Sequence, residues 1–179
     1  MGNDTNLANE ADLLAAVQRG DEDAFAVLIT HYYPLLFRVA YRWCAHKADA
    51  EDVAQEAAIK MGESIATYRG ESALSSWVYR IVVNLAKDKM RRQRREVGLT
   101  EAFTLPDTGP GLEQHLAAAQ LWHYVRSLPE AQCDAMLLVH AEGLSHAEAA
   151  KVLQCAESTV SWYIHEAKKT LTGLYARDE

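Results

Sequence analysis

The stretch GLSHAEAAKVLQCAESTVSWYIHEAKKTL, residues 143–171, decides the fold that we predict for the C-terminal half of the chain. Ser145 and Glu148 have the spacing of a capping box, which predicts a short helix ending near Leu153. A turn follows at 154–156, and apolar residues then recur at three and four positions, as on the buried side of a helix. This inward seam consists of Val160, Ile164, Ala167, Leu171 and Leu174. The pattern predicts a helix-turn-helix, although spacing alone also fits an ordinary helical hairpin.

Upstream residues predict a supporting helix and, before it, a boundary between two domains. Ser127 and Glu130 repeat the capping-box spacing. The helix that they would start runs to Gly143 and carries Met136, Leu137 and Leu138. Residues 96–112, EVGLTEAFTLPDTGPGL, lose the apolar period and collect Gly, Pro and Thr, which is typical of a flexible linker. We therefore predict domains at 1–95 and 113–179, joined by a linker at 96–112.

The N-terminal half shows the same helical period, and no segment alternates convincingly as a strand does. Pro34 falls near one predicted helix start. Two or three helices before residue 49 are marked by Leu13, Leu14, Val17, Phe25, Leu28, Ile29, Leu35, Leu36, Val39 and Ala40. The predicted fold class is therefore all-α, with two small helical domains joined by a flexible linker.

The net charge of the chain is −7, but its charged residues are unevenly distributed along the sequence. Residues 1–56 carry 4 basic and 10 acidic side chains (−6), whereas residues 57–95 carry 9 and 3 (+6). Residues 96–143 carry 1 and 7 (−6), and residues 144–179 carry 4 and 5 (−1). A sign reversal of this size is evidence about binding partners rather than about fold.

The acidic surface centres on DAEDVAQE, residues 49–56. On a helix, its carboxylates form one stripe that points outward, made of Asp49, Asp52, Glu56 and Glu63. The opposite, core-facing side carries Ala54, Ala57, Ala58, Met61 and Ile65. The spacing alone also fits a solvated helix face whose acidic residues simply favour the helix N-terminus.

The basic surface follows about thirty residues later. One face of the predicted helix carries Arg80, Asn84, Lys87, Arg91, Arg94 and Arg95, and another carries Val78, Ile81, Val82 and Leu85. Trp77 lies at the edge of the basic face, after a loop YRGES at 68–72. Aromatic side chains beside a cationic track suit stacking on unpaired bases. A solvated helix end with a core tryptophan remains the alternative.

Composition limits the class of protein. No apolar run could span a membrane and no leader is visible, so we expect a cytoplasmic protein without membrane insertion. Cys44, Cys133 and Cys155 lack the number and spacing of a disulfide framework or zinc site, so we expect buried thiols. We expect no metal, cofactor or catalytic residue. His140 and His146 each begin an H-x-E triplet, but the P-C-x-x-C of a zinc deaminase is missing.

Three segments, in this order along the chain, resemble one family. DAEDVAQE is similar to the region-two motif of extracytoplasmic-function sigma factors, and SSWVYRIVVNLAKDKMRRQRR resembles their promoter-melting helix. LPEAQCDAMLLVHAEGLSHAEAAKVL, with STVSWYIHEAKKTL, resembles their region four. The resemblance covers nearly the whole chain. It implies a small two-domain initiation subunit of bacterial RNA polymerase.

The resemblance also implies partners: core RNA polymerase, promoter DNA and an inhibitory anti-sigma factor. The surface that docks on the basic coiled coil of the largest polymerase subunit would be Asp49, Asp52, Gln55 and Glu56. Minus-ten DNA would be bound by Tyr68, Arg69, Ser72, Trp77, Arg80, Asn84, Lys87 and Arg91. Minus-thirty-five DNA would be bound by Ser158, Thr159, Ser161, Trp162, His165, Glu166 and Lys169.

Some positions depart from the family pattern. Gln154 replaces a customary turn glycine, which is acceptable if the position stays outside the left-handed region. Glu166 stands where basic residues are frequent, and it could accept a hydrogen bond from a cytosine amino group. A stand-alone helix-turn-helix regulator, and a sigma mimic that sequesters an anti-sigma factor, are the alternative functions.

Overall fold

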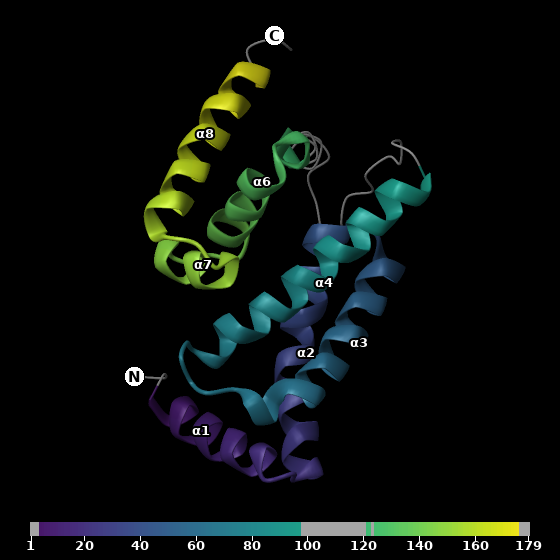
Figure 1. The fold of residues 1–179 in the computed structure, drawn as a ribbon, viewed down its shortest axis with the longest axis vertical. Coiled ribbons are helices and arrows are strands. Elements are labelled where there is room, and N and C mark those ends of the chain that lie inside the picture. The colour runs from purple at the N-terminus through teal and green to yellow at the C-terminus, as the bar shows by residue number, and fades with distance from the viewer. Residues whose placement is uncertain (1–3, 98–120, 123, 176–179) are drawn as a thin grey trace, which may run out of the picture. The chain divides into compact units, whose positions relative to one another are not determined.

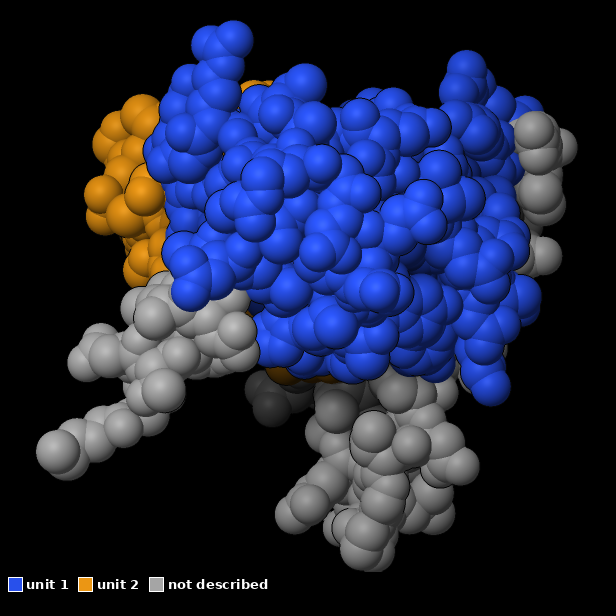
Figure 2. Space-filling view, turned by 90° about the horizontal axis from the view of Figure 1, so that it is seen from below, with its two compact units in different colours: residues 1–100 blue, residues 101–179 orange. Residues whose placement is uncertain are grey.

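The structure, a computed structural model, describes residues 4–97, 121–122 and 124–175 (Figure 1). All regular structure within these residues is helical, as predicted. The chain divides into two compact units, residues 1–100 and 101–179, which Figure 2 colours separately. The all-α fold class is therefore confirmed. Of the predicted linker, residues 96 and 97 end a helix and residues 98–112 lie outside the described residues, so its boundaries stay predictions.

Unit 1 contains helices α1 (Asp4–Gln18), α2 (Glu22–Cys44), α3 (Lys47–Ser64) and α4 (Leu74–Val97), with a single 3₁₀ turn η1 (Ile65–Thr67) after α3. Helices α2, α3 and α4 pack against one another, and α1 packs against α2 and η1. The core is formed by apolar side chains at helical spacing, among them Leu28, Leu36, Val39, Val53, Met61, Val78 and Val82, all at most 1% exposed. Residues 68–73 between η1 and α4 contain the loop on which the site depends.

Helix α2 contains Pro34 in its interior, so the prediction of a helix start near this residue is wrong. The helix begins instead at Glu22, and the side chain of its N-cap, Asp21, accepts a hydrogen bond from the backbone amide of Ala24 at 2.9 Å. An interior proline costs a helix about 3 kcal/mol. The buried face of α2 continues from Leu28 past the proline to Val39, and packing of this face against α3 and α4 outweighs that cost.

Unit 2 contains helical turns at 121–122 and 124–127, then α6 (Glu130–Met136), a wider π turn η2 (Leu137–Ala141), α7 (His146–Leu153) and α8 (Glu157–Tyr175). Helix α8 packs on α6 and α7. The predicted inward seam is confirmed, because Val160, Ile164, Ala167 and Leu171 are buried and Leu174 is partly buried against the same cluster. The helix-turn-helix is thus formed by α7 and α8.

The two predicted capping boxes have different outcomes. At α7 both bonds are present: the Ser145 Oγ accepts from the Glu148 amide at 3.2 Å, and the Glu148 Oε2 accepts from the Ser145 amide at 2.8 Å. The box at Ser127 is wrong, because its hydroxyl donates back to the Tyr124 carbonyl at 2.7 Å and α6 starts after Pro129 without a side-chain cap. Ser127 still belongs to the preceding helical turn, whereas an N-cap needs a non-helical backbone.

Gln154 adopts the left-handed conformation, with φ 55° and ψ 44°, so the expectation that it avoids this region is wrong. The amides of Gln154 and Cys155 both donate to the Ala150 carbonyl, and this tight C-terminal turn separates α7 from α8. The three cysteines are half-buried free thiols rather than fully buried ones.

Candidate nucleic-acid and polymerase interfaces

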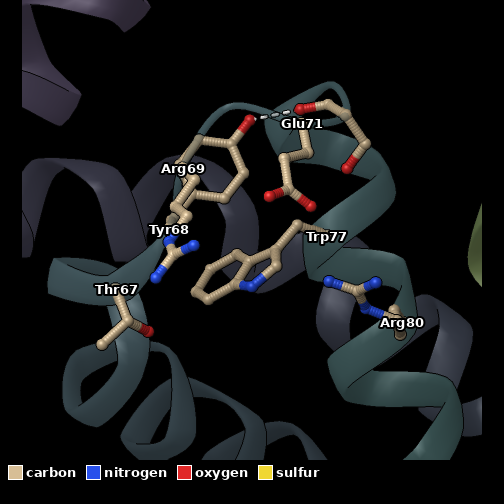
Figure 3. A pocket seen from close by; sticks show the side chains of 7 residues that line it. Thr67, Tyr68, Arg69, Glu71, Trp77 and Arg80 are labelled. Atoms are coloured by element: carbon tan, nitrogen blue, oxygen red, sulfur yellow. Dashed lines mark hydrogen bonds between the residues drawn. The ribbon is translucent and has the colours of Figure 1, made fainter.

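A pocket of about 270 Å³ lies between the loop after η1 and the first turns of α4 (Figure 3). Its lining is formed by Thr67, Tyr68, Arg69, Glu71, Ser72, Trp77 and Arg80. In this view the guanidinium groups of Arg69 and Arg80 lie on either side of the Trp77 indole. Five of the eight residues predicted to bind minus-ten DNA therefore line one cavity, which forms where the loop residues Tyr68, Arg69 and Ser72 lie against Trp77 and Arg80 of α4.

The loop is shaped by a few local contacts. Gly70 has φ 73°, a conformation that a residue with a Cβ adopts only at a cost. The Tyr68 hydroxyl donates to the Ser72 carbonyl and closes the loop, and its ring lies 5.5 Å from the Trp77 ring at a tilt of 56°. Trp77 is only 8% exposed. The indole, predicted at the edge of the basic face, is therefore mostly a wall of the pocket anchored in the core.

The basic face of α4 leads away from this pocket. Arg80 and Lys87 are half-buried, and Asn84 and Arg91 are exposed. The Arg91 side chain also contacts Asp88, at 3.3 Å. Val78 and Val82 are buried as predicted, and Val83 and Ala86 join them in the core. The three remaining minus-ten candidates, Asn84, Lys87 and Arg91, thus continue along the helix from the cavity.

The acidic stripe on α3 is only partly free to face a partner. Asp52, Gln55, Glu56 and Glu63 are exposed, but the Asp49 side chain is 17% exposed. Lys89 of α4 lies 3.1 Å from an Asp49 oxygen and 3.2 Å from an Asp52 oxygen. The prediction that all the carboxylates point outward together is therefore wrong for Asp49.

The Asp49 carboxylate is held by three side chains, those of Lys89, Gln93 and His46. Besides Lys89, the Gln93 amide donates to its Oδ2 at 2.8 Å and the His46 Nδ1 lies 3.2 Å from the same oxygen. Burial on its own would raise the pKa of Asp49, but the hydrogen bonds from Gln93 and Lys89 and the positive charge of Lys89 lower it overall. Hydrogen bonds to Asp49 and Asp52 raise the pKa of Lys89. The acidic and basic surfaces therefore meet at this ion-paired cluster, which stays charged at neutral pH.

The outer surface of the helix-turn-helix carries the candidates for minus-thirty-five DNA. Ser158, Ser161, Trp162, His165 and Lys169 are exposed, whereas Thr159 and Glu166 are half-buried. Trp162 is 56% exposed and its ring lies 5.4 Å from that of Tyr163. The His146 Nδ1 lies 2.8 Å from the Ser161 hydroxyl, which links the start of α7 to the recognition surface of α8.

Sequence reasoning missed several residues of these surfaces. Thr67 lines the pocket, and Lys89 and Gln93 hold Asp49. Lys89 lies two positions after Lys87, so helical geometry places the two on different faces of α4. This difference in direction is the feature of the sequence that indicates a separate partner for Lys89, distinct from the partner of the basic face.

Comparison with known proteins matches both units to one family. Residues 28–96 match the family model described as Sigma-70 region 2, and residues 118–171 match Sigma-70, region 4. An ECF RNA polymerase sigma-E factor of Haemophilus influenzae is 33% identical over 173 residues, covering 89% of this chain and 91% of the relative. The RNA polymerase sigma-H factor of Pseudomonas aeruginosa is 33% identical over 181 residues, covering 92% and 94%.

Solved structures show the same fold. CnrH, solved in complex with the cytosolic domain of CnrY, has a TM-score of 0.70 at 21% identity, covering 93% of this chain and 97% of that one. The sigma factor RpoE of Bartonella quintana, solved with the anti-sigma factor NepR, has a TM-score of 0.68 at 23% identity, covering 87% and 98%. Among the residues described, no helical segment combines the length and hydropathy of a membrane span. With matches to both family regions and relatives similar over almost its whole length, the chain belongs to the extracytoplasmic-function group of the sigma-70 family.

Proposed function

We propose that this protein is an alternative sigma subunit, which binds core RNA polymerase, recognises minus-ten and minus-thirty-five promoter elements and directs transcription initiation in the cytoplasm. The single observation that supports this best is the cavity at the start of α4, which gathers Tyr68, Arg69, Ser72, Trp77 and Arg80. The protein acts as a non-catalytic subunit, because the polymerase supplies the chemistry of RNA synthesis.

The cavity receives an unpaired base of the minus-ten element. Tyr68 and Arg69 offer flat surfaces for stacking, and Trp77 forms the wall behind them. Stacking of a base on an aromatic side chain contributes about 1–3 kcal/mol. Arg80, Lys87 and Arg91 bind phosphates along α4, and Asn84 lies between them with an exposed amide. Together these contacts favour the strand-separated promoter over the duplex.

Core polymerase is bound by the exposed acidic residues of α3. Asp52, Gln55 and Glu56 face solvent, and the negative charges of Asp52 and Glu56 complement a basic helix of the polymerase. Asp49 contributes to the same surface indirectly, because its contacts with Lys89 and Gln93 also fix this end of α3 against α4.

The minus-thirty-five element is read by α8 in the major groove. Ser158, Thr159, Ser161, Trp162, His165 and Lys169 supply contacts, and Glu166 accepts from a cytosine amino group. Only Lys169 among these seven is a permanent cation, so the contribution of phosphate neutralisation here is small.

Regulation follows from the relatives. RpoE of Bartonella quintana was solved with an anti-sigma factor, and CnrH with the cytosolic domain of CnrY. We propose that a cognate anti-sigma factor likewise covers the polymerase-binding surface of this chain and holds it inactive.

Run-off transcription tests the proposal. Purified full-length protein is added to core polymerase of the encoding bacterium, with its genomic DNA fragments as templates. The expected result is a set of discrete transcripts that depend on the added protein. Sequence-specific DNA binding by the chain alone, with no added transcript in the presence of core polymerase, would indicate a helix-turn-helix regulator instead.

A further inference from the structure

Helix α1 contacts the pocket loop through its last residue, Gln18. The side-chain amide of Gln18 donates to the Tyr68 carbonyl at 2.9 Å and to the Ile65 carbonyl at 3.3 Å. These two carbonyls belong to the first and the last residue of the turn that carries the chain into the pocket loop. Residue 18 lies before the segment 28–96 that matches the region 2 family model.

The turn offers these carbonyls for a structural reason. Helix η1 is only one turn long, and the Ile65 carbonyl accepts from the Tyr68 amide at 3.2 Å. At Tyr68 the backbone becomes extended, with φ −66° and ψ 122°, so no following helical turn can supply a donor to the Tyr68 carbonyl. Gln18 supplies that donor and fixes the direction in which the chain leaves η1.

Gln18 is itself held in place, because α1 is anchored to the core. The Tyr32 hydroxyl of α2 donates to a Glu10 carboxylate oxygen at 2.9 Å, and Tyr32 is 5% exposed. Burial, together with this bond to Glu10, raises the pKa of Tyr32, so the hydroxyl remains a donor at neutral pH. Packing of α1 on both α2 and η1 completes the attachment.

The position of the Tyr68 backbone directly affects the shape of the cavity, because Tyr68 lines it. The Tyr68 hydroxyl donates a hydrogen bond to the Ser72 carbonyl, and the Tyr68 ring packs against Trp77. The backbone position of Tyr68 therefore fixes where both ends of the loop lie. A site that is already in its bound conformation avoids the entropy cost of ordering when the ligand binds.

We infer that Gln18 is a positioning residue for the base-binding pocket: its bonds to Ile65 and Tyr68 hold the loop in the conformation that accepts an unpaired base. The inference rests on the proposed function of this pocket. It extends the minus-ten site to a helix outside the matched family segment.

The test is the affinity of holoenzyme for fork-junction DNA built on a promoter from the run-off assay. Each base of its single-stranded minus-ten segment is replaced in turn by an abasic site, and the position with the largest loss for the wild-type protein marks the pocket base. Gln18→Ala and Gln18→Glu are compared with Thr30→Ala, which removes a side-chain bond to the Ala26 carbonyl within α2. Circular dichroism melting establishes that each variant is folded.

Gln18→Ala should weaken binding of the intact fork by about two- to tenfold, the range that one neutral hydrogen bond provides, and leave the abasic fork unchanged. Gln18→Glu should weaken it further, because a carboxylate then faces two carbonyls. Thr30→Ala should not alter the penalty for the abasic site. An equal loss on both forks, or no loss on either, would overturn the role of Gln18. If the wild-type protein shows no abasic penalty at any position, the pocket itself does not bind a base and the proposed minus-ten site fails with it.

Discussion

Gln154 holds a left-handed backbone at the turn between α7 and α8, where most helices of this kind place a glycine. A residue with a Cβ pays about 1–2 kcal/mol in this region. Ala45 is in the same conformation at the end of α2, with φ 58°. Both helix ends therefore contain strain that is local to one residue.

Gln154→Gly should stabilise the C-terminal unit by about 1 kcal/mol. The substitution removes the strain of a Cβ in the left-handed region, but glycine also increases the conformational entropy of the unfolded chain, which offsets part of the gain. Urea unfolding of the full chain, followed by circular dichroism, measures the change. Gln154→Ala is the control, since it keeps the Cβ and should show no comparable gain. Equal stability of the glycine and alanine variants would mean that the left-handed turn is not strained.

Lys89 is the residue at which the two charged surfaces meet, and its contribution to stability should depend on pH. The pKa of Asp49 is lowered in the folded state, so the ion pair contributes fully above the unfolded pKa of Asp49, about 4. Its contribution is lost as the pH falls through the folded pKa, below that value. On the alkaline side the limit is set by Lys89: because its pKa is raised, the contribution remains complete up to the unfolded pKa of lysine, about 10, and is lost as the pH rises through the higher folded pKa.

Lys89→Met should therefore lower the free energy of unfolding at pH 7 by up to about 1 kcal/mol, and by progressively less as the pH falls below 4. Urea titrations between pH 7 and pH 3 measure the difference. Lys60→Met is the matched control, because Lys60 and Glu63 form a pair at 3.1 Å with both side chains more than half exposed. A loss for Lys89→Met that does not change with pH would show that packing, and not the ion pair, stabilises the contact.

At the scale of the element, α8 combines a buried seam with an outer surface that carries little positive charge. Ser161 is linked to His146 of α7, so the position of the recognition surface depends on the preceding helix. Burial, followed by the charges of Lys168 and His146, lowers the pKa of His140. This histidine therefore adds no cation near the helix at neutral pH.

Glu166→Ala should relax the base preference at one position of the minus-thirty-five element by about 1–3 kcal/mol, if the carboxylate accepts from a cytosine amino group. The measurement is holoenzyme affinity for duplexes that carry each of the four base pairs at every position of the element. Lys169→Ala is the control, and it should weaken binding to all sequences alike. A uniform gain in affinity for Glu166→Ala would instead mean that Glu166 only repels phosphates.

At the scale of the whole molecule, opposite charges lie on neighbouring helices, and we propose that they bind two different partners. The net charge of −7 hides a basic α4 beside an acidic α3, and Lys89 joins the two. Helix α4 therefore serves both surfaces: Arg80, Asn84, Lys87 and Arg91 belong to the proposed DNA surface, and Lys89 and Gln93 support the proposed polymerase surface.

Asp52→Arg with Glu56→Arg should lower the affinity for core polymerase at least tenfold, because reversed charges repel the basic partner; this corresponds to about 1.4 kcal/mol. The chain should stay folded, although the Lys89–Asp52 bond at 3.2 Å is lost. Glu63→Arg is the charge-reversal control, because Glu63 is an exposed residue of α3 outside the proposed polymerase-binding set. Arg91→Ala should leave core binding intact and weaken open-complex formation, because its proposed partner is phosphate.

Core affinity and open-complex formation are measured for these variants at one fixed salt concentration, since exposed charges are screened. Normal core binding by the folded double variant would show that this part of α3 is only a solvated helix face.

The sequence by itself determined the local features of this protein. The helical class, the turn at 154–156 and the seam from Val160 to Leu174 follow from apolar periods of three and four residues. The capping box of Ser145 and Glu148 follows from a spacing within one turn. These features depend only on residues that are close together in the sequence. The two oppositely charged surfaces can be predicted from the sequence for the same reason.

Tertiary structure alone decided which helix lies opposite each side chain. A helical period gives the direction of Asp49 around the axis of α3, but it does not place Lys89 of α4 beside it, forty residues later. The continuous path of α2 through Pro34 depends on packing against α3 and α4 in the same way. The pocket needs η1, the loop and α4 together, and its link to Gln18 joins residues 47 and 50 positions apart. Such contacts depend on how the helices pack. The free energy of burying the apolar faces selects the relative positions of the helices, and the local spacing of residues does not determine these positions.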